Sequence, residues 1–247
     1  MKRWIWPLVL AAGVLLIGGV WTSGSNRASW ISLAPGVDLR RCTIATADFE
    51  DAPVVAIRCS PNRVHVIGCG RAAPLDAAGW LTRARGIAAI NGGFFDPLSR
   101  PLGLLVSGGR RISRFRHVPQ GVFSVASNRS AIQHCRDVSP DEITSMSEAI
   151  ECGPVLVDAG VPARVKPQRA RRSGIGIDRQ GRVIMAVADG PVSLPEWAAF
   201  WASKQGLACR NALNLDGGPS TQMAVRSSSQ YIDVRGGWPV PDAIVVK

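Results

Sequence analysis

The stretch Leu213-Asn214-Leu215-Asp216-Gly217-Gly218-Pro219-Ser220-Thr221 joins an apolar run to a carboxylate, a glycine pair and two hydroxyl residues. The apolar run predicts a buried strand over Ala212–Leu215, with Asp216 at its end. Two glycines remove Cβ atoms, so backbone N–H groups can converge there on an anion. The alternative is a simple hairpin turn, which would not need Ser-Thr after the glycines. The stretch therefore predicts a strand that delivers a carboxylate to a phosphate-binding loop.

Two other stretches repeat this pattern of an apolar strand, a polar residue at its end and then glycine. They are Ala89-Ile90-Asn91-Gly92-Gly93-Phe94-Phe95-Asp96 and Met185-Ala186-Val187-Ala188-Asp189-Gly190. A strand that ends in Asn-Gly or Asp-Gly is most often an ordinary turn. The repetition nevertheless makes Asn91 and Asp189 candidates for the same site as Asp216.

Short β-type runs bounded by turn residues dominate the rest of the chain, and three segments have helix signals. The helices are expected over Pro74–Arg85, from the Ser139 capping box towards Ile150, and from the Ser193 capping box to about Gln205. No internal repeat or second linker interrupts residues 27–247. The pattern predicts an α+β class, with one strand-rich mixed domain. The predicted strands are Val54–Cys59, Val64–Ile67, Ile87–Ile90, Leu104–Val106, Gly121–Val125, Val155–Val157, Gly174–Ile177, Val183–Val187, Ala212–Leu215, Gln222–Val225 and Ala243–Val246.

The chain is strongly basic, with 29 Lys and Arg against 18 Asp and Glu, a net charge of +11. Such a surplus favours an anionic partner, although high genomic use of Arg would give the same composition. A single Tyr and the lack of interleaved aromatic and basic residues argue against nucleic-acid binding. Within the basic run 164–172, Arg172 is nearest to a predicted strand and is the best candidate for a phosphate ligand. Arg169 lies further out, where we expect a solvated loop.

The N-terminal residues 1–26 have the character of a signal anchor or a signal peptide. No charged residue lies between Arg3 and Arg27, and the apolar stretch is long enough to cross a bilayer as a helix. Lys2 and Arg3 precede it, which orients the rest of the chain outward. No clear cleavage site follows, which favours a membrane anchor facing the periplasm or exterior; cleavage would give a secreted protein.

Six cysteines lie in the portion expected to be exported: Cys42, Cys59, Cys69, Cys135, Cys152 and Cys209. An even number in an oxidising compartment predicts at least one disulfide. Cys209 lies beside a predicted core strand and is the best candidate for a free thiol. None of the six has the spacing of a zinc site.

The chain resembles the phosphodiester glycosidase family through six motifs that occur in the family's order. Pro219 and Thr221 stand where the family loop often has a third glycine and a second serine, and Pro219 removes one N–H donor. The resemblance implies a site formed by Asn91, Arg172, Asp189, Asp216 and the loop residues Gly217, Gly218, Ser220 and Thr221. The motifs are Asn91-Gly92-Gly93-Phe94-Phe95, Pro101-Leu102-Gly103, Gly153-Pro154-Val155-Leu156, Arg172-Ser173-Gly174-Ile175-Gly176, Asp189-Gly190 and Leu215-Asp216-Gly217-Gly218-Pro219-Ser220.

The implied activity is hydrolysis of sugar-1-phosphodiester linkages in an envelope or extracellular glycan. Arg172 and the loop would neutralise the phosphate, Asp189 and Asp216 would supply the carboxylates, and Asn91 would hold a sugar hydroxyl or the phosphate. The alternative is a non-catalytic module that binds an anionic envelope polysaccharide. Glu196 is expected to cap a helix and Asp96 to form a turn.

No metal or other cofactor is expected from the sequence. The histidines His65, His117 and His134 follow no ligand pattern. Carboxylate and carbonyl oxygens could still hold calcium without a sequence signal.

Overall fold

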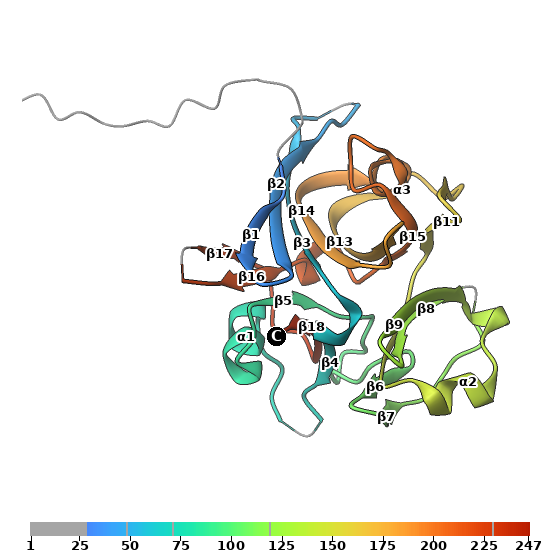
Figure 1. Ribbon diagram of the computed structural model, residues 1–247. Coiled ribbons are helices and arrows are strands. Elements are labelled where there is room, and N and C mark those ends of the chain that lie inside the picture. Colours follow the sequence, from blue (N-terminus) through green and yellow to red (C-terminus); the bar gives the residue numbers. More distant parts are fainter. Residues whose placement is uncertain (1–28, 48, 71, 119, 229) are drawn as a thin grey trace, which may run out of the picture.

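Three antiparallel β-sheets make up most of the fold in the computed structural model, which describes residues 29–247 apart from 48, 71, 119 and 229 (Figure 1). The large sheet has the order β1(Ile31–Ala34), β2(Val37–Ile44), β3(Ala52–Cys59), β14(Val183–Ser193), β13(Arg169–Asp178), β15(Cys209–Asn214), β11(Val155–Asp158), β12(Val161–Pro162). The second sheet has the order β7(Arg110–Ser113), β6(Leu105–Ser107), β10(Glu148–Cys152), β8(Gly121–Ala126), β9(Arg129–His134). The third has the order β17(Tyr231–Val234), β16(Met223–Arg226), β5(Ala88–Asn91), β18(Asp242–Val246), β4(Val64–Gly68).

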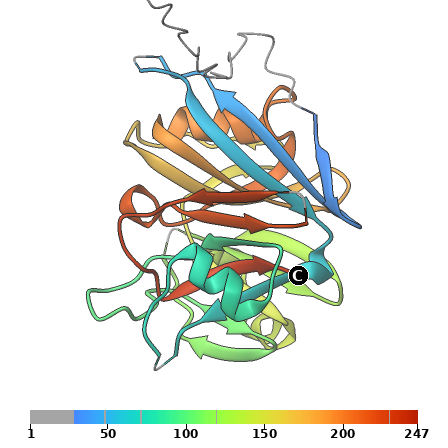
Figure 2. The same ribbon diagram turned by 90° about the vertical axis from the view of Figure 1, so that its left-hand side faces the viewer.

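One hydrophobic core lies between the inner faces of all three sheets. It includes Ile57 and Met185 from the large sheet, Phe123 from the second, and Ile90 and Ile244 from the third, all fully buried. Because side chains alternate between the faces of a strand, each sheet keeps a second apolar face that needs its own cover. Figure 2 shows the strands of the third sheet lying across the middle of the molecule, below the large sheet.

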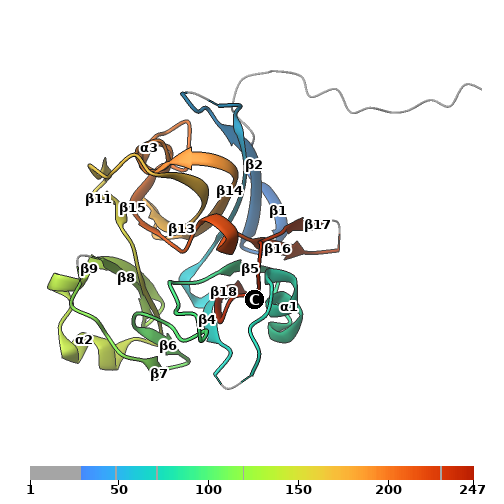
Figure 3. The same cartoon turned by 180° about the vertical axis from the view of Figure 1, so that it is seen from behind.

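Three helices cover the outer faces of the sheets: α1(Ala77–Ala84) packs on the third, α2(Pro140–Ser145) on the second and α3(Leu194–Ala202) on the large sheet (Figures 1 and 3). Trp197 and Trp201 of α3 are fully buried against the large sheet. The Trp201 ring lies so close to β13 that a Cβ atom on Gly176 would meet it at 2.7 Å. The glycine is therefore required by helix packing.

Both predicted capping boxes are present. The Ser139 hydroxyl accepts from the Glu142 N–H, and the Ser193 hydroxyl accepts from the Glu196 N–H, with each glutamate bonding back to the serine N–H. Glu196 is thus a helix cap, as expected. The helix after Ser139 ends at Ser145, well before Ile150, because β10 takes up the following residues. Similarly, α3 ends at Ala202 and not near Gln205.

The cysteines differ from the prediction, because the structure holds all six as free thiols and forms no disulfide among them. Burial raises the pKa of every one of these thiols above its ordinary value. Cys209 is buried and free, as expected for that residue.

The predicted N-terminal anchor or signal peptide, residues 1–26, lies outside the described residues. Among the residues that are described, none of the helices combines the length and the apolar character needed to cross a membrane.

Candidate functional site

Strands from two sheets end at the same place and bring together residues that are far apart in sequence. Asp216 follows β15 of the large sheet, and its N–H donates to the Gly92 carbonyl, which follows β5 of the third sheet, at 3.2 Å. The Leu215 N–H donates to the Ser173 carbonyl on β13 at 3.0 Å. The two glycine-containing stretches that begin at Asn91 and at Asp216 therefore meet, as their shared pattern suggested.

The Asn91 side chain links these segments by hydrogen bonds. Its side chain is fully buried; Nδ2 donates to the Asp216 carbonyl at 2.8 Å, and Oδ1 accepts from the Ser173 hydroxyl at 2.7 Å. The same Oδ1 accepts from the Gln222 N–H at 3.2 Å. Because these bonds occupy the amide, Asn91 positions the Asp216 backbone here instead of presenting an amide to a sugar or phosphate.

Asp216 itself is half-buried at the mouth of the strand. Its Oδ1 accepts from the Gly217 N–H at 3.0 Å, and its carboxylate also hydrogen-bonds the Ser220 side chain. Burial raises the pKa of Asp216, against the opposing effect of these two hydrogen bonds. A carboxyl group with a raised pKa at an open strand end is suited to proton transfer.

Asp242, at the start of β18, is a site residue that the sequence did not indicate. It is 1% exposed; Oδ1 accepts from the Gly93 N–H at 2.8 Å, and Oδ2 has no hydrogen-bond partner among the described residues. A Cβ atom on Gly92 would stand 1.8 Å from Oδ1, so the glycine makes room for this carboxyl group. Burial raises the pKa of Asp242 to about 7; the Gly93 N–H opposes the rise and the Asp216 charge adds to it.

The substitution Asp242→Asn should make stability less dependent on pH. The unfolded chain has an ordinary Asp pKa of about 3.9, so between about pH 4 and 7 the folded protein binds more protons than the unfolded chain. Its stability therefore falls as pH rises through that window. The free energy of unfolding of the variant, relative to that of the native protein, should therefore rise by up to about 4 kcal/mol from pH 4 to pH 8. Denaturant unfolding at several pH values measures this gain, and a difference that stays constant with pH would contradict it.

Arg172 lies on β13 next to the loop and carries a buried positive charge. It is 5% exposed; Nε donates to the Val192 carbonyl at 3.0 Å, and Nη2 donates to the Gln168 carbonyl. Burial lowers the pKa of Arg172 to about 10, so it remains cationic at neutral pH. Its Nη1 stands 3.8 Å from the place of a Cβ atom on Gly217. No carboxylate pairs with this guanidinium in the described part of the chain.

Asp189 is held by an arginine that the sequence did not single out. Arg171 Nη2 lies 2.6 Å from Asp189 Oδ1, and the Asp189 side chain is 47% exposed. The Arg171 carbonyl lies 2.9 Å from where a Cβ atom on Gly217 would stand, so the backbone that carries this arginine contacts the loop.

Arg169 differs from the expected solvated position. It forms a two-pronged ion pair with Glu196, at 3.0 and 3.1 Å, and its side chain is 24% exposed. Burial alone would raise the pKa of Glu196, but bonds from Ser193, the Ala47 N–H and Arg169 lower it to about 2. Arg169 thus stabilises the start of α3.

The glycine loop forms a turn of 3₁₀ helix, η3(Gly218–Ser220), in which several N–H groups bond within the loop. The Ser220 N–H donates to the Gly217 carbonyl and the Thr221 N–H to the Gly218 carbonyl. Thr221 is fully buried, and its hydroxyl has no partner among the described residues. The loop therefore offers fewer converging N–H groups than an open anion-binding loop would. Phosphate binding stays a prediction for its residues Gly217, Gly218, Ser220 and Thr221.

Trp238 is a further residue beside the loop that the sequence did not indicate. Its indole N–H donates to the Ser220 hydroxyl at 3.2 Å, while the side chain remains 50% exposed. Ser220 also hydrogen-bonds the Asp216 carboxylate, so the exposed Trp238 ring and this carboxylate contact the same serine.

The described residues contain no group of three or more His, Cys, Asp or Glu side chains arranged to hold a metal ion. The sequence prediction of Asp96 as a turn residue is confirmed: it accepts from the Leu98 and Arg100 N–H groups.

Comparisons with known proteins identify a curated relative, similar solved structures and a matching family model. An uncharacterised Escherichia coli K12 protein, YigE, is 29% identical over 145 residues, covering 52% of this chain and 54% of that relative. The chain thus spans about half the length of this curated relative.

Two solved structures share the fold. The zebrafish N-acetylglucosamine-1-phosphodiester alpha-N-acetylglucosaminidase catalytic domain, auto-inhibited by its pro-peptide, has a TM-score of 0.71 at 17% identity, covering 89% of this chain and 86% of that one. A hypothetical protein from Synechocystis has a TM-score of 0.63 at 18% identity, covering 90% of this chain and 64% of that one.

The family model that describes phosphodiester glycosidases matches residues 84–247, about two thirds of the chain. This range contains every candidate site residue, including Asp242 and Trp238, which the sequence did not indicate. The protein therefore belongs to the phosphodiester glycosidase family.

Proposed function

We propose that this protein hydrolyses sugar-1-phosphodiester linkages of an envelope or extracellular glycan. One observation supports this most strongly. The buried Arg172 guanidinium has no carboxylate partner among the described residues, and it lies beside the loop that carries Asp216. A phosphodiester anion at this loop would supply the missing negative charge.

The chemistry follows from how the two carboxylates differ. Asp216 has a raised pKa and can exchange a proton with the leaving oxygen or with the attacking water. Asp189 is paired with Arg171 and can stabilise positive charge that develops on the sugar ring. Arg172 neutralises the phosphate, Asn91 positions the Asp216 backbone, and Asp242 holds the neighbouring Gly93 N–H.

An extracytoplasmic location is part of the proposal. It rests on the uncharged N-terminal stretch that follows Lys2 and Arg3. Washing membranes with high salt, without detergent, separates the anchored form, which stays on the membrane, from a cleaved form, which is released.

Trp238 is our candidate for stacking on the sugar ring, because its exposed ring is held next to the loop by the bond to Ser220. The substitution Trp238→Ala should raise KM about tenfold and leave kcat nearly unchanged, because the ring adds binding that is equal in ground and transition states. Trp238→Phe keeps the ring and loses the N–H, so it should retain most of the affinity. Steady-state kinetics on both variants tests this, and an equal effect in both would assign the role to the indole N–H.

The activity can be tested on the full chain with a panel of sugar-1-phosphodiesters in ¹⁸O-labelled water. Matched phosphomonoesters and diesters without a sugar serve as controls. The proposal predicts hydrolysis of the sugar diesters, and the product that carries the label identifies whether the sugar–O or the P–O bond breaks. Turnover of the sugar-free diester at the same rate would contradict the proposed specificity.

A further inference from the structure

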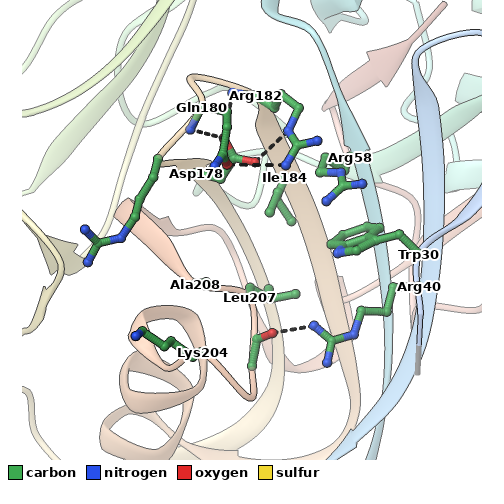
Figure 4. Close-up of a pocket in the computed structure, with 12 residues that line it drawn as sticks. Trp30, Arg40, Arg58, Asp178, Gln180, Arg182, Ile184, Lys204, Leu207 and Ala208 are labelled. Carbon is green, nitrogen blue, oxygen red and sulfur yellow. Dashed lines mark hydrogen bonds and ion pairs between the residues drawn. The ribbon is translucent and has the colours of Figure 1, made fainter. Parts of the chain in front are cut away.

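A cavity of about 200 Å³ lies at the opposite end of β13 from the candidate site (Figure 4). It is bordered by the β13–β14 turn, the segment after α3, and strands β2 and β3. Six residue steps separate Arg172 from Asp178 on β13, which corresponds to about 20 Å along the strand. This cavity is therefore separate from the Asp216 site.

The cavity wall contains more positive than negative charge. Two of its arginines form ion pairs. Arg58 Nη2 lies 2.7 Å from Asp38 Oδ2, and Arg182 Nε lies 2.7 Å from Asp178 Oδ2. Asp178 also accepts from the Gln180 N–H at 2.9 Å, so its carboxylate is fully engaged within the turn. The carboxylates therefore neutralise only these two arginines.

Three further cations on the wall have no ion-pair partner in the described part of the chain: Arg40, Arg179 and Lys204. Arg40 is 8% exposed; it donates to the Gly206 carbonyl and to the Gln205 carbonyl at 2.9 Å, while its buried Nε has no partner. A buried guanidinium without a counter-charge is costly unless an anion approaches it. Figure 4 shows Arg40, Arg58 and Arg182 arranged around the same space.

The remaining wall is apolar and gives the cavity a defined shape. Ile184 and Leu207 are buried behind the cavity, and the Trp30 ring forms one side, with the Arg58 guanidinium 4.3 Å from its centre. A phosphate group would fit among the cations, with room beside Trp30 for part of the molecule that carries it.

We propose that this cavity binds a phosphate group, distinct from the phosphodiester at the Asp216 site. Arg40 supplies unpaired positive charge inside the cavity, and Arg58 and Arg182 lie on the same wall. Arg179 and Lys204 are exposed at its edge and add to the positive potential that attracts the anion. The group can belong to a small phosphate or to a phosphate-bearing polymer, since both present the same chemistry.

Calorimetric titration of the full chain with inorganic phosphate, and separately with linear polyphosphate, tests the proposal. The double variant Arg179→Gln/Lys204→Gln removes two exposed charges and leaves Arg40 to hold its turn. It should weaken binding about tenfold or more. The control Arg110→Gln/Arg129→Gln removes the same charge from exposed strands of the second sheet and should leave binding unchanged.

The two ligands distinguish the sources. Saturable binding of inorganic phosphate that depends on the cavity arginine and lysine supports a site for small phosphates, and the same dependence for polyphosphate alone supports a polymer. Phosphate bound at the Asp216 site is the part of the signal that Arg172→Lys should reduce, and the cavity variant should leave that part unchanged. An equal loss of affinity in both double variants would overturn the proposal, because binding would then reflect diffuse surface charge. Unchanged affinity in the cavity variant would also overturn it, because binding would then occur at another site.

Discussion

Replacing Asp216 by asparagine should lower turnover of a sugar-1-phosphodiester by about two to four orders of magnitude. The substitution keeps the size of the side chain and its contact with the Gly217 N–H, but it removes the group that exchanges a proton. Burial raises the pKa of Asp216, which favours proton exchange by the native carboxyl, and the amide has no proton of this kind to exchange. Steady-state turnover and melting temperature, measured side by side, separate catalysis from folding.

The exposed Asp137, in the 3₁₀ turn η2(Cys135–Asp137) that follows β9 of the second sheet, provides a matched control, because Asp137→Asn makes the same chemical change outside the candidate site. It should leave turnover and melting temperature unchanged. If Asp216 only braced its turn, asparagine would serve nearly as well, and near-normal turnover would remove Asp216 from the catalytic machinery. A collapsed melting temperature would instead make its role structural.

Replacing Arg172 by lysine should lower kcat/KM by about two orders of magnitude. The lysine keeps a positive charge but loses the planar fork that grips phosphate and that here also bonds the Val192 and Gln168 carbonyls. The measurement is kcat/KM on the same diester, together with the melting temperature of each variant.

Arg169 offers the comparison, because it is three residues away and already occupied by Glu196. Arg169→Lys should leave kcat/KM within a few-fold of the native value and should act mainly on stability, through the start of α3. Equal losses of kcat/KM at both positions would mean that a diffuse basic surface, and not one arginine, binds the phosphate.

The apolar runs predicted most strands of the core, and each of the eleven runs overlaps a strand of the structure. They missed β2 and β10, which also contribute residues to the core. The strands that were not predicted include β7(Arg110–Ser113), β9(Arg129–His134) and β17(Tyr231–Val234), whose residues are largely polar or exposed. Edge strands pair through their backbones and need little apolar pattern, so composition does not reveal them. The disulfide prediction failed because an even cysteine count says nothing about which side chains face one another.

The site was predictable where a strand ends in a polar residue and glycine, as at Asn91 and Asp216. Asp242 was not, because it precedes the apolar run Ala243–Val246 and looks like an ordinary residue at the start of a strand. Only the pairing of β18 with β5 places its carboxyl under Gly92 and Gly93. Arg171 was likewise hidden, since a bulge in β13 turns it towards Asp189 within a run of similar arginines.

The most direct test of the central proposal measures binding and turnover of one sugar-1-phosphodiester by the native protein and by Asp216→Asn. The account predicts that the native protein binds and hydrolyses the diester, and that the variant still binds it but hydrolyses it about two to four orders of magnitude more slowly. Saturable binding by the native protein without any hydrolysis would contradict the account and favour a module that binds an anionic glycan.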